Sequence, residues 1–129
     1  MEAPIILLVE DDILIQELLL AQFDDSGFEI VTANDGNQAL AELNADAGRF
    51  KAVITDIRLP GGPDGWEIAR CAREHVPDMP IVYMTGDSTH EWPSKGVPDS
   101  VVFLKPFPIM QLSTAVATLI TAADTRRAG

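Results

Sequence analysis

Five short, mainly apolar runs recur along the chain, and segments with helical periodicity fill most of the intervals between them. The runs lie at residues 5–9, 28–31, 52–54, 81–85 and 101–105. Runs of this kind are typical of strands buried on both faces, as in a parallel sheet that helices cover on each side. Because crossovers between parallel strands are right-handed, the pattern predicts an α/β fold with a doubly wound, five-stranded parallel sheet.

Helices are expected in four of the intervals. They should cover residues 13–23, a stretch from Asn34 to about Ala45, a stretch from Gly65 to Val76, and a last stretch that begins at Pro108. The expected core-facing residues are Ile15, Leu18, Leu19, Gln22 and Phe23 in the first helix, and Ile109, Leu112, Val116, Leu119 and Ile120 in the last. The interval 86–98 holds two prolines and two glycines. At most one helical turn fits there, with Asp87 or Ser88 as its cap, so a fourth helix should be short or absent.

The composition limits both the size of the fold and its partners. With 129 residues, the chain should form one domain over 1–129, with frayed ends at about 1–3 and 124–129. Its net charge of −11 argues against direct binding to nucleic acid or to an anionic membrane surface. The apolar run 5–9 is too short to insert into a membrane, and the single cysteine, Cys71, cannot form an internal disulfide. A reducing, cytoplasmic location is therefore expected.

Polar residues follow four of the five expected strands at their carboxyl ends. They are the acidic run Glu10-Asp11-Asp12, then Asp56, Thr85 and Lys105. In an open parallel sheet these ends share one edge, and ligands bind in the crevice outside it. We therefore expect these side chains to form one site, because polar residues scattered at random would not select the same strand end each time.

This set of side chains suits phosphoryl transfer to an aspartate. Adjacent carboxylates raise one another's pKa unless a cation joins them, and Mg²⁺ prefers one or two carboxylates together with water and phosphate oxygens. Asp56 is the expected nucleophile, with Lys105 and Thr85 to hold the phosphoryl oxygens. Taken singly, each residue has an ordinary alternative: Asp56 as a turn cap, Lys105 as a solvated strand end, Thr85 as a β-former, and the acidic run as a helix N-terminus.

The same residues carry a resemblance to a known family. Over its whole length the chain resembles the receiver domain of two-component response regulators, of the stand-alone, single-domain type. The matching pieces are Val9-Glu10-Asp11-Asp12, Thr55-Asp56 with Leu59-Pro60 and Asp64-Gly65, Tyr83-Met84-Thr85-Gly86, and Leu104-Lys105-Pro106-Phe107. The resemblance implies a flavodoxin-like sheet with strand order 2-1-3-4-5.

The resemblance also implies how a metal ion would be held next to the acceptor. Asp56 would be the phospho-acceptor and would contribute to the metal site. Asp11 would be a direct ligand of Mg²⁺, with Mn²⁺ as an alternative ion, and Glu10 would act through water. The backbone carbonyl of Arg58 would be a further ligand.

Around the phosphoryl group, the resemblance implies a second set of contacts. Thr85 would be the switch hydroxyl, and Lys105 would be the phosphoryl-binding cation, joined to Pro106 by a cis peptide bond. The side chains of Arg58 and Asp87, together with Gly86, would border the path by which the phosphoryl group arrives and leaves.

Two departures from the family pattern bear on the mechanism. The loop 59–65 is one residue longer than the usual loop, which changes access to the acceptor. Receivers commonly carry Tyr or Phe three residues before the lysine, where this chain has Val102. Phe103 is adjacent, but a shift of one residue places it on the opposite sheet face. The two-state element is therefore expected to be the loop 86–98, ordered on phosphorylation, and not the usual aromatic switch.

Three functions are compatible with the sequence. The leading one is a response regulator that takes a phosphoryl group on Asp56 from a histidine kinase or histidine phosphotransfer protein, with no enzymatic activity beyond this self-limited transfer and its own dephosphorylation. No output domain is expected after Arg127, so its output would be protein binding. The second is a degenerate receiver that binds partners without phosphorylation, which would have lost Asp11, Asp56 or Lys105. The third is a phosphohydrolase with an aspartyl nucleophile, which would carry a second aspartate where this chain has Arg58.

Two surfaces are candidates for partner binding. Leu14 and Leu20 lie off the core stripe of the first helix, close to the acidic run, and are expected to contribute to docking of the phosphodonor protein. The last helix has no charged side chain between Pro106 and Ala123. Its outer positions, Thr118 among them, are small or uncharged, so we expect a helix-packing interface for a protein partner or for a second copy of the chain.

Overall fold

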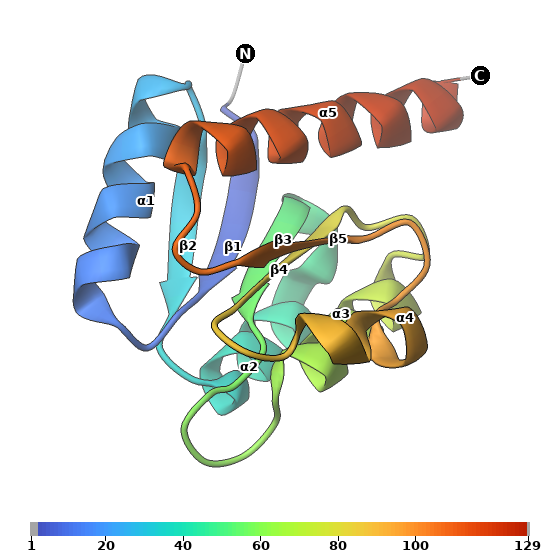
Figure 1. Ribbon diagram of the computed structural model, residues 1–129. Coiled ribbons are helices and arrows are strands. Elements are labelled where there is room, and N and C mark those ends of the chain that lie inside the picture. The colour runs from blue at the N-terminus through green and yellow to red at the C-terminus, as the bar shows by residue number, and fades with distance from the viewer. Residues whose placement is uncertain (1–2, 129) are drawn as a thin grey trace.

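A computed structural model describes residues 3–128 as an α/β sandwich built on a five-stranded parallel sheet (Figure 1). The strands are β1 (Ile5–Val9), β2 (Glu29–Ala33), β3 (Phe50–Asp56), β4 (Ile81–Thr85) and β5 (Val101–Leu104). Their order in the sheet is β2-β1-β3-β4-β5. The predicted fold class and the strand order implied by the family resemblance are therefore confirmed.

Helices cover both faces of the sheet. They are α1 (Ile13–Asp25), α2 (Gly36–Asp46), α3 (Gly65–His75), α4 (Trp92–Lys95) and α5 (Ile109–Ala128), with 3-10 turns η1 (Ala47–Arg49) and η2 (Thr89–Glu91). α1 and α5 pack on the face that carries Leu8, whereas α2 and α3 pack on the face that carries Leu7. Three helices begin after an aspartate whose carboxylate accepts a backbone N–H of the first turn: Asp12, Asp35 and Asp64.

β5 shows how register decides which layer a side chain joins. Val102 packs with the core under α2 and α3, and Phe103 packs with the core under α1 and α5, as the alternation along a strand predicts. Phe103 lies against Phe107, with ring centroids 5.5 Å apart. On the other face, Tyr83 is fully buried against Trp66, with ring centroids 4.8 Å apart. Val102, at the position where receivers commonly carry an aromatic side chain, is thus a small aliphatic residue packed in this core.

The buried stripe of α1 differs from the prediction. Leu18 leaves 58% of its surface exposed, whereas Gln16 is buried beside Leu19. The Gln16 amide nitrogen donates hydrogen bonds to the backbone carbonyl of Glu10 and to Asn34 Oδ1. Because its polar atoms have partners, the glutamine can occupy a core position without the penalty of an unsatisfied buried amide.

The interval after β4 holds more helix than the single turn that the sequence predicts. η2 and α4 follow one another directly, and Pro93 lies in the first turn of α4, where a backbone donor is not required. Trp92 Nε1 donates to Ser100 Oγ at 3.0 Å, and the Val97 backbone N–H donates to Tyr83 Oη at 3.1 Å. The fourth helix is short, as predicted. Since the interval is already structured, a switch in it must rearrange existing contacts.

The C-terminal end of the chain remains helical. α5 continues to Ala128, and residues 1, 2 and 129 lie outside the described part of the chain, so the predicted fraying at about 1–3 and 124–129 stays a prediction. Arg127 donates from two nitrogens to the carboxylate of Asp78, at 2.8 and 2.6 Å, which ties the last turn to the loop before β4. Although α5 has 20 residues, no helix between residues 3 and 128 is long and apolar enough to cross a membrane.

Candidate functional site

Three carboxylates meet at the carboxyl edge of the sheet. β1 is followed by Glu10 and Asp11, and β3 ends at Asp56. Val9 of β1 pairs in register with Thr55 of β3, so the residues that follow them are also neighbours. One carboxylate oxygen from each of Glu10, Asp11 and Asp56 lies within 4.8 Å of the others, close enough to share a metal ion. The structure thus brings together the acidic residues that the sequence singles out.

Lys105 supplies the positive charge of this cluster. Its ammonium nitrogen lies 2.8 Å from Glu10 Oε1 and 3.1 Å from Asp56 Oδ2. Its backbone N–H donates to the Thr85 carbonyl at 2.7 Å, which continues the pairing of β5 with β4 by one residue. The Lys105-Pro106 bond is cis, as the resemblance implies. From the end of β5, the side chain reaches past β4 to the acceptor on β3.

Burial and mutual repulsion change the pKa values of the acidic groups in different directions. Burial, followed by the charge of Glu10, raises the pKa of Asp56 to about 7. Burial acts on Glu10 as well, but hydrogen bonds from Lys105 and from the Asp12 backbone outweigh it and hold the Glu10 pKa below its ordinary value. Burial and the neighbouring Glu10 also raise the pKa of Asp11. The negative charge of Asp56 is therefore poorly compensated, which favours a further cation beside it.

The acceptor faces an open cavity of about 430 Å³. Its lining consists of Asp56, Arg58, Thr85, Gly86, Asp87 and Lys105. The Thr85 hydroxyl accepts the backbone N–H groups of Asp87 and Ser88, at 3.2 and 2.9 Å, and donates to Asp87 Oδ1 at 3.4 Å. Arg58 Nε donates to the same carboxylate oxygen at 2.9 Å. The ion pair of Arg58 with Asp87 thus joins the two loops that border the cavity.

Two polar side chains support the site in ways that sequence reasoning missed. Ser88, one of the two predicted caps, is the N-cap residue of η2, but its side chain makes no capping hydrogen bond; its buried hydroxyl donates to Asp87 Oδ1 at 2.8 Å instead. Gln16 holds the backbone carbonyl of Glu10 and so fixes the segment that carries the acidic pair. A serine in an irregular interval and a glutamine on a helix belong to no motif, so no signal in the sequence distinguishes them.

The long loop between β3 and α3 passes very close to the acceptor. A Cβ atom on Gly65 would lie 2.3 Å from the Asp56 carbonyl oxygen, so a larger residue cannot occupy this position without moving the backbone. Gly61 and Gly62 have positive φ angles of 47° and 72°, a conformation that glycine adopts most readily. The glycines let the loop return close to the backbone of Asp56. Arg58, near the start of the loop, lines the cavity in front of the acceptor.

The residues predicted to contact partners are exposed to different degrees. Leu14 and Thr118 are exposed, and Leu20 is half-buried. The Thr118 hydroxyl donates to the Thr114 carbonyl within α5 at 2.9 Å, so its polar group is satisfied inside the helix. The docking roles of these residues stay predictions, as does the metal-binding role of the Arg58 backbone carbonyl.

Sequence comparison identifies a family and several relatives that this chain is similar to. The response regulator receiver domain family matches residues 6–117. The chain is 37% identical over 111 residues to a response regulator receiver protein of Anaeromyxobacter sp. (strain Fw109-5), which covers 86% of this chain but only 43% of that protein. It is 32% identical over 120 residues to the response regulator receiver protein CpdR of Brucella abortus (strain 2308), which covers 92% of this chain and 98% of that protein.

Solved structures agree with the sequence relatives. A response regulator receiver protein from Sinorhizobium medicae WSM419 superposes with a TM-score of 0.90 and 43% identity, over 94% of this chain and 97% of that one. The response regulator protein TrrA from Thermotoga maritima, solved in complex with Mg²⁺-BeF, has a TM-score of 0.78 and 31% identity, over 90% and 98% of the two chains. Agreement in sequence and in fold over most of the chain shows that this protein belongs to the response regulator receiver domain family.

Proposed function

We propose that this receiver is phosphorylated on Asp56 by a histidine kinase or a histidine phosphotransfer protein, and that phosphorylation changes its binding to another protein. The observation that supports this most directly is the placement of Lys105, whose ammonium group joins Asp56 to Glu10 within the carboxylate cluster. A fixed cation beside a nucleophilic carboxylate, with an open cavity in front, suits a reactant that arrives with negative charge. The proposed location is the cytoplasm, since the lone Cys71 fits a reducing compartment.

In the proposed transfer, a carboxylate oxygen of Asp56 attacks the phosphorus atom of a phosphohistidine. The P–O bond forms as the P–N bond breaks, and the imidazole leaves with the bonding electron pair. The Lys105 ammonium group, 3.1 Å from the acceptor, can transfer its hydrogen bond to a phosphoryl oxygen. The Thr85 hydroxyl can donate to a second phosphoryl oxygen after releasing Asp87, a contact of 3.4 Å that is long for a hydroxyl donor. Loss of the Thr85–Asp87 contact would alter the hydrogen bonds among Thr85, Asp87 and Ser88, the residues that lead into η2 and α4.

The residues at the edge of the sheet fit a divalent metal ion next to the acceptor. Glu10, Asp11 and Asp56 offer oxygen atoms within 4.8 Å of one another, and burial raises the pKa of both Asp11 and Asp56. Such hard oxygen donors suit Mg²⁺, with Mn²⁺ as an alternative. When bound, the ion would neutralise charge on the phosphoryl oxygens. Asp11 would contact it directly, Glu10 through water, and the backbone carbonyl of Arg58 would complete the protein ligands.

Two alternative functions fit the site less well. A receiver that acts purely as a binding module would have no need of the acceptor geometry, yet Asp11, Asp56 and Lys105 are all in place. An aspartyl phosphohydrolase would need an acid two residues after the nucleophile, where Arg58 instead pairs with Asp87. We therefore propose no enzymatic activity beyond the transfer to Asp56 and the hydrolysis of its own acyl phosphate.

Incubation with phosphoramidate and Mg²⁺ is expected to add one phosphoryl group to the chain, which intact mass spectrometry would detect. EDTA should suppress the adduct, because the clustered carboxylates then repel the incoming anion. Asp56→Asn should show no adduct, whereas Asp46→Asn, a matched change at an exposed position, should be modified as fully as the parent. An undiminished adduct in Asp56→Asn would place the acceptor elsewhere and refute the proposal.

The exposed start of α1 is the proposed docking surface for the phosphodonor protein. Leu14→Asp is expected to slow transfer from a phosphorylated histidine kinase at least about tenfold. In the complex with the kinase, the variant would bury a charged carboxylate where the parent buries an apolar side chain. Modification by phosphoramidate should be unchanged, since Leu14 is 71% exposed and contributes little to the fold. Leu20→Asp, at a half-buried position, serves as the comparison for a variant that also perturbs packing. An unchanged transfer rate in Leu14→Asp would rule out docking at this surface.

A further inference from the structure

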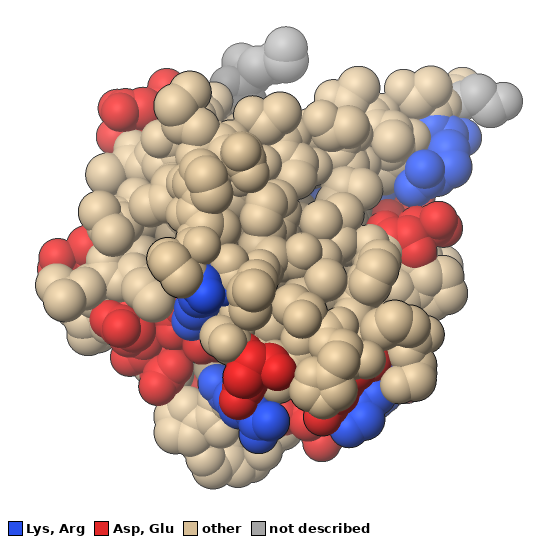
Figure 2. Space-filling model, viewed as in Figure 1, with Lys and Arg blue, Asp and Glu red and all other residues tan. Residues whose placement is uncertain are grey.

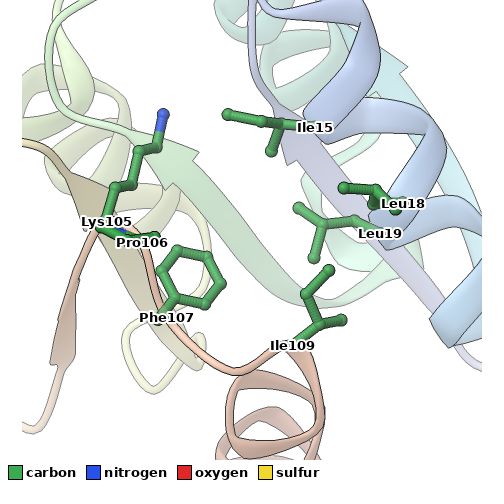
Figure 3. A pocket seen from close by; sticks show the side chains of 7 residues that line it. All are labelled: Ile15, Leu18, Leu19, Lys105, Pro106, Phe107 and Ile109. Atoms are coloured by element: carbon green, nitrogen blue, oxygen red, sulfur yellow. The ribbon is translucent and has the colours of Figure 1, made fainter.

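The two faces of the sheet differ in the groups that they offer to a ligand. On the face that α1 and α5 cover, Figure 2 shows the area over α5 and β5 as a broad surface with few charged side chains. A groove of about 380 Å³ lies there between α1 and the start of α5, lined by Lys105, Ile15, Leu18, Leu19, Phe107 and Ile109. Figure 3 shows the α1 side chains facing Phe107 and Ile109 across it. Apolar side chains offer no ligand atoms to a metal ion, whereas the face that α2 and α3 cover presents several.

Three polar side chains meet between α2 and α3: Asn44, Cys71 and His75. The Cys71 thiol donates to Asn44 Oδ1 at 3.8 Å, and His75 Nε2 lies 3.0 Å from the same oxygen. Asn44 lies in the last turn of α2, and His75 is the last residue of α3. Cys71 and His75 are four residues apart on α3, so their side chains lie on the same face of that helix. The two helices thus bring a thiol, an imidazole and an amide oxygen to one place.

The types and the spacing of these groups suit a zinc ion. Thiolate sulfur and imidazole nitrogen are its preferred ligands, and two ligands four residues apart on a helix can bind the same ion. In a tetrahedral site with Zn–S bonds of about 2.3 Å and Zn–N and Zn–O bonds of about 2.1 Å, neighbouring ligand atoms are about 3.4–3.6 Å apart. Both separations from Asn44 Oδ1 are close to this value. The oxygen, the nitrogen and the sulfur therefore need only small movements to surround one ion.

The surroundings favour a bound cation over a reactive thiol. Burial, followed by the charge of Glu74, raises the pKa of the Cys71 thiol, so little thiolate is available to act as a nucleophile. A zinc ion would reverse this, because a thiol that coordinates it loses its proton. The C-terminal ends of α2 and α3, which meet at this point, carry partial negative charge. The net charge of −11 attracts cations to the chain as a whole.

We propose that Cys71, His75 and Asn44 bind one zinc ion, which joins the C-terminal ends of α2 and α3. Water takes the fourth position, because Asn44 and His75 are exposed to solvent. On binding, the Cys71 thiol releases its proton to solvent as the Zn–S bond forms. His75 takes the tautomer that is protonated on Nδ1, so that the lone pair of Nε2 faces the ion. The ion then replaces the two hydrogen-bonding contacts that Asn44 Oδ1 makes with these side chains.

Titration of the full, reduced chain with Cd²⁺, as a spectroscopic substitute for Zn²⁺, tests this proposal. A thiolate bound to Cd²⁺ absorbs in the ultraviolet, and an ion held only by the carboxylates of Glu10, Asp11 and Asp56 does not give this band. The band should saturate at one Cd²⁺ per chain with a Kd of about 10 µM or below, and Zn²⁺ should displace the Cd²⁺. Asp56→Asn should leave this Kd unchanged, so the outcome is independent of the acceptor role of Asp56.

Variants of the other two ligands separate this site from a thiol that binds the ion alone. His75→Gln should raise the Kd at least about tenfold, whereas His90→Gln, at another exposed position, should leave it unchanged. Asn44→Asp should lower the Kd, because it supplies a carboxylate oxygen at the same place, and Asn44→Ala should raise it. Absence of the band at about 0.1 mM Cd²⁺ overturns the proposal. So does a Kd that His75→Gln does not raise, that His90→Gln changes or that Asn44→Asp does not lower, and so does saturation at one ion per two chains.

Discussion

Asn in place of Asp56 should raise the unfolding free energy of the metal-free protein at pH 8, by on the order of 3 kcal/mol. Burial, followed by the charge of Glu10, raises the pKa of Asp56 from an ordinary 3.8 to about 7. Between these two values the folded state binds more protons than the unfolded chain, so the unfolding free energy falls as the pH rises. An amide of the same shape removes both the charge and this loss of stability.

Urea unfolding in EDTA at several pH values would measure this effect. The difference between Asp56→Asn and the parent should grow as the pH rises from about 4 and should level off above about 7. Asp46→Asn changes an exposed aspartate and should show a small difference at every pH. A difference for Asp56→Asn that does not vary with pH would contradict the proposed origin, since a change in packing alone has no link to proton binding.

The fold was predictable because the strands consist mainly of consecutive apolar residues, which are stable only when both faces of the sheet are covered. Ile6, Leu7 and Leu8 are consecutive and fully buried, so side chains on both faces of β1 need a helical layer. The five parallel strands follow from that requirement and from right-handed crossovers. Strand order came from the family resemblance alone, because apolar runs do not indicate which strands are neighbours.

The acceptor and its cation were also predictable, since strand ends in a parallel sheet converge. Asp56 and Lys105 are separated by 49 residues, yet each follows a strand, and their side chains meet at 3.1 Å. The network around Asp87 was less accessible to sequence reasoning. Arg58 contacts Asp87 only because two irregular loops pack together, and the local hydrogen bond from Ser88 to Asp87 depends on the conformation of an irregular segment.

The misplacement of Leu18 has a similar cause. A helical stripe drawn from apolar residues includes Leu18, but the first turns of α1 are rotated so that Gln16 faces the core and bonds Glu10 and Asn34. Hydrophobicity identifies the side of a helix that can be buried, whereas a hydrogen-bonded polar residue can shift that side by part of a turn. The exposed Leu18 then becomes one wall of the groove beside α5.

Met in place of Lys105 should destabilise the metal-free protein by about 2–3 kcal/mol at pH 8. The ammonium group is paired with Glu10 and Asp56, and Glu10 has no exposed surface. Methionine keeps a long apolar side chain against the groove of α1 and α5, so the variant removes the charge with little change in volume. Glu10 then stays buried with its backbone contact to Asp12 but without a cation.

The sign of the pH dependence follows from Glu10. Despite burial, its hydrogen bond from Lys105 holds the pKa below the ordinary 4.5, so the stabilisation is present above that value and is lost as the pH falls. Removal of the lysine should therefore matter most at pH 8 and least in acid, where protonated carboxylates need no cation. Binding of Mg²⁺ should become tighter, because the ion no longer competes with an ammonium group for the same oxygens.

Urea unfolding at pH 8 and at an acidic pH well below the depressed pKa of Glu10, followed by a Mg²⁺ titration at pH 8, would check both expectations. Lys95→Met is the matched control, because its ion pair with Glu91, at 3.3 Å, is exposed to solvent and should contribute little to stability at either pH. Equal destabilisation of Lys105→Met at both pH values would mean that the side chain stabilises the protein by packing in the groove. In that case the charge of Lys105 would serve the incoming phosphoryl group and would contribute little to the stability of the resting carboxylate cluster.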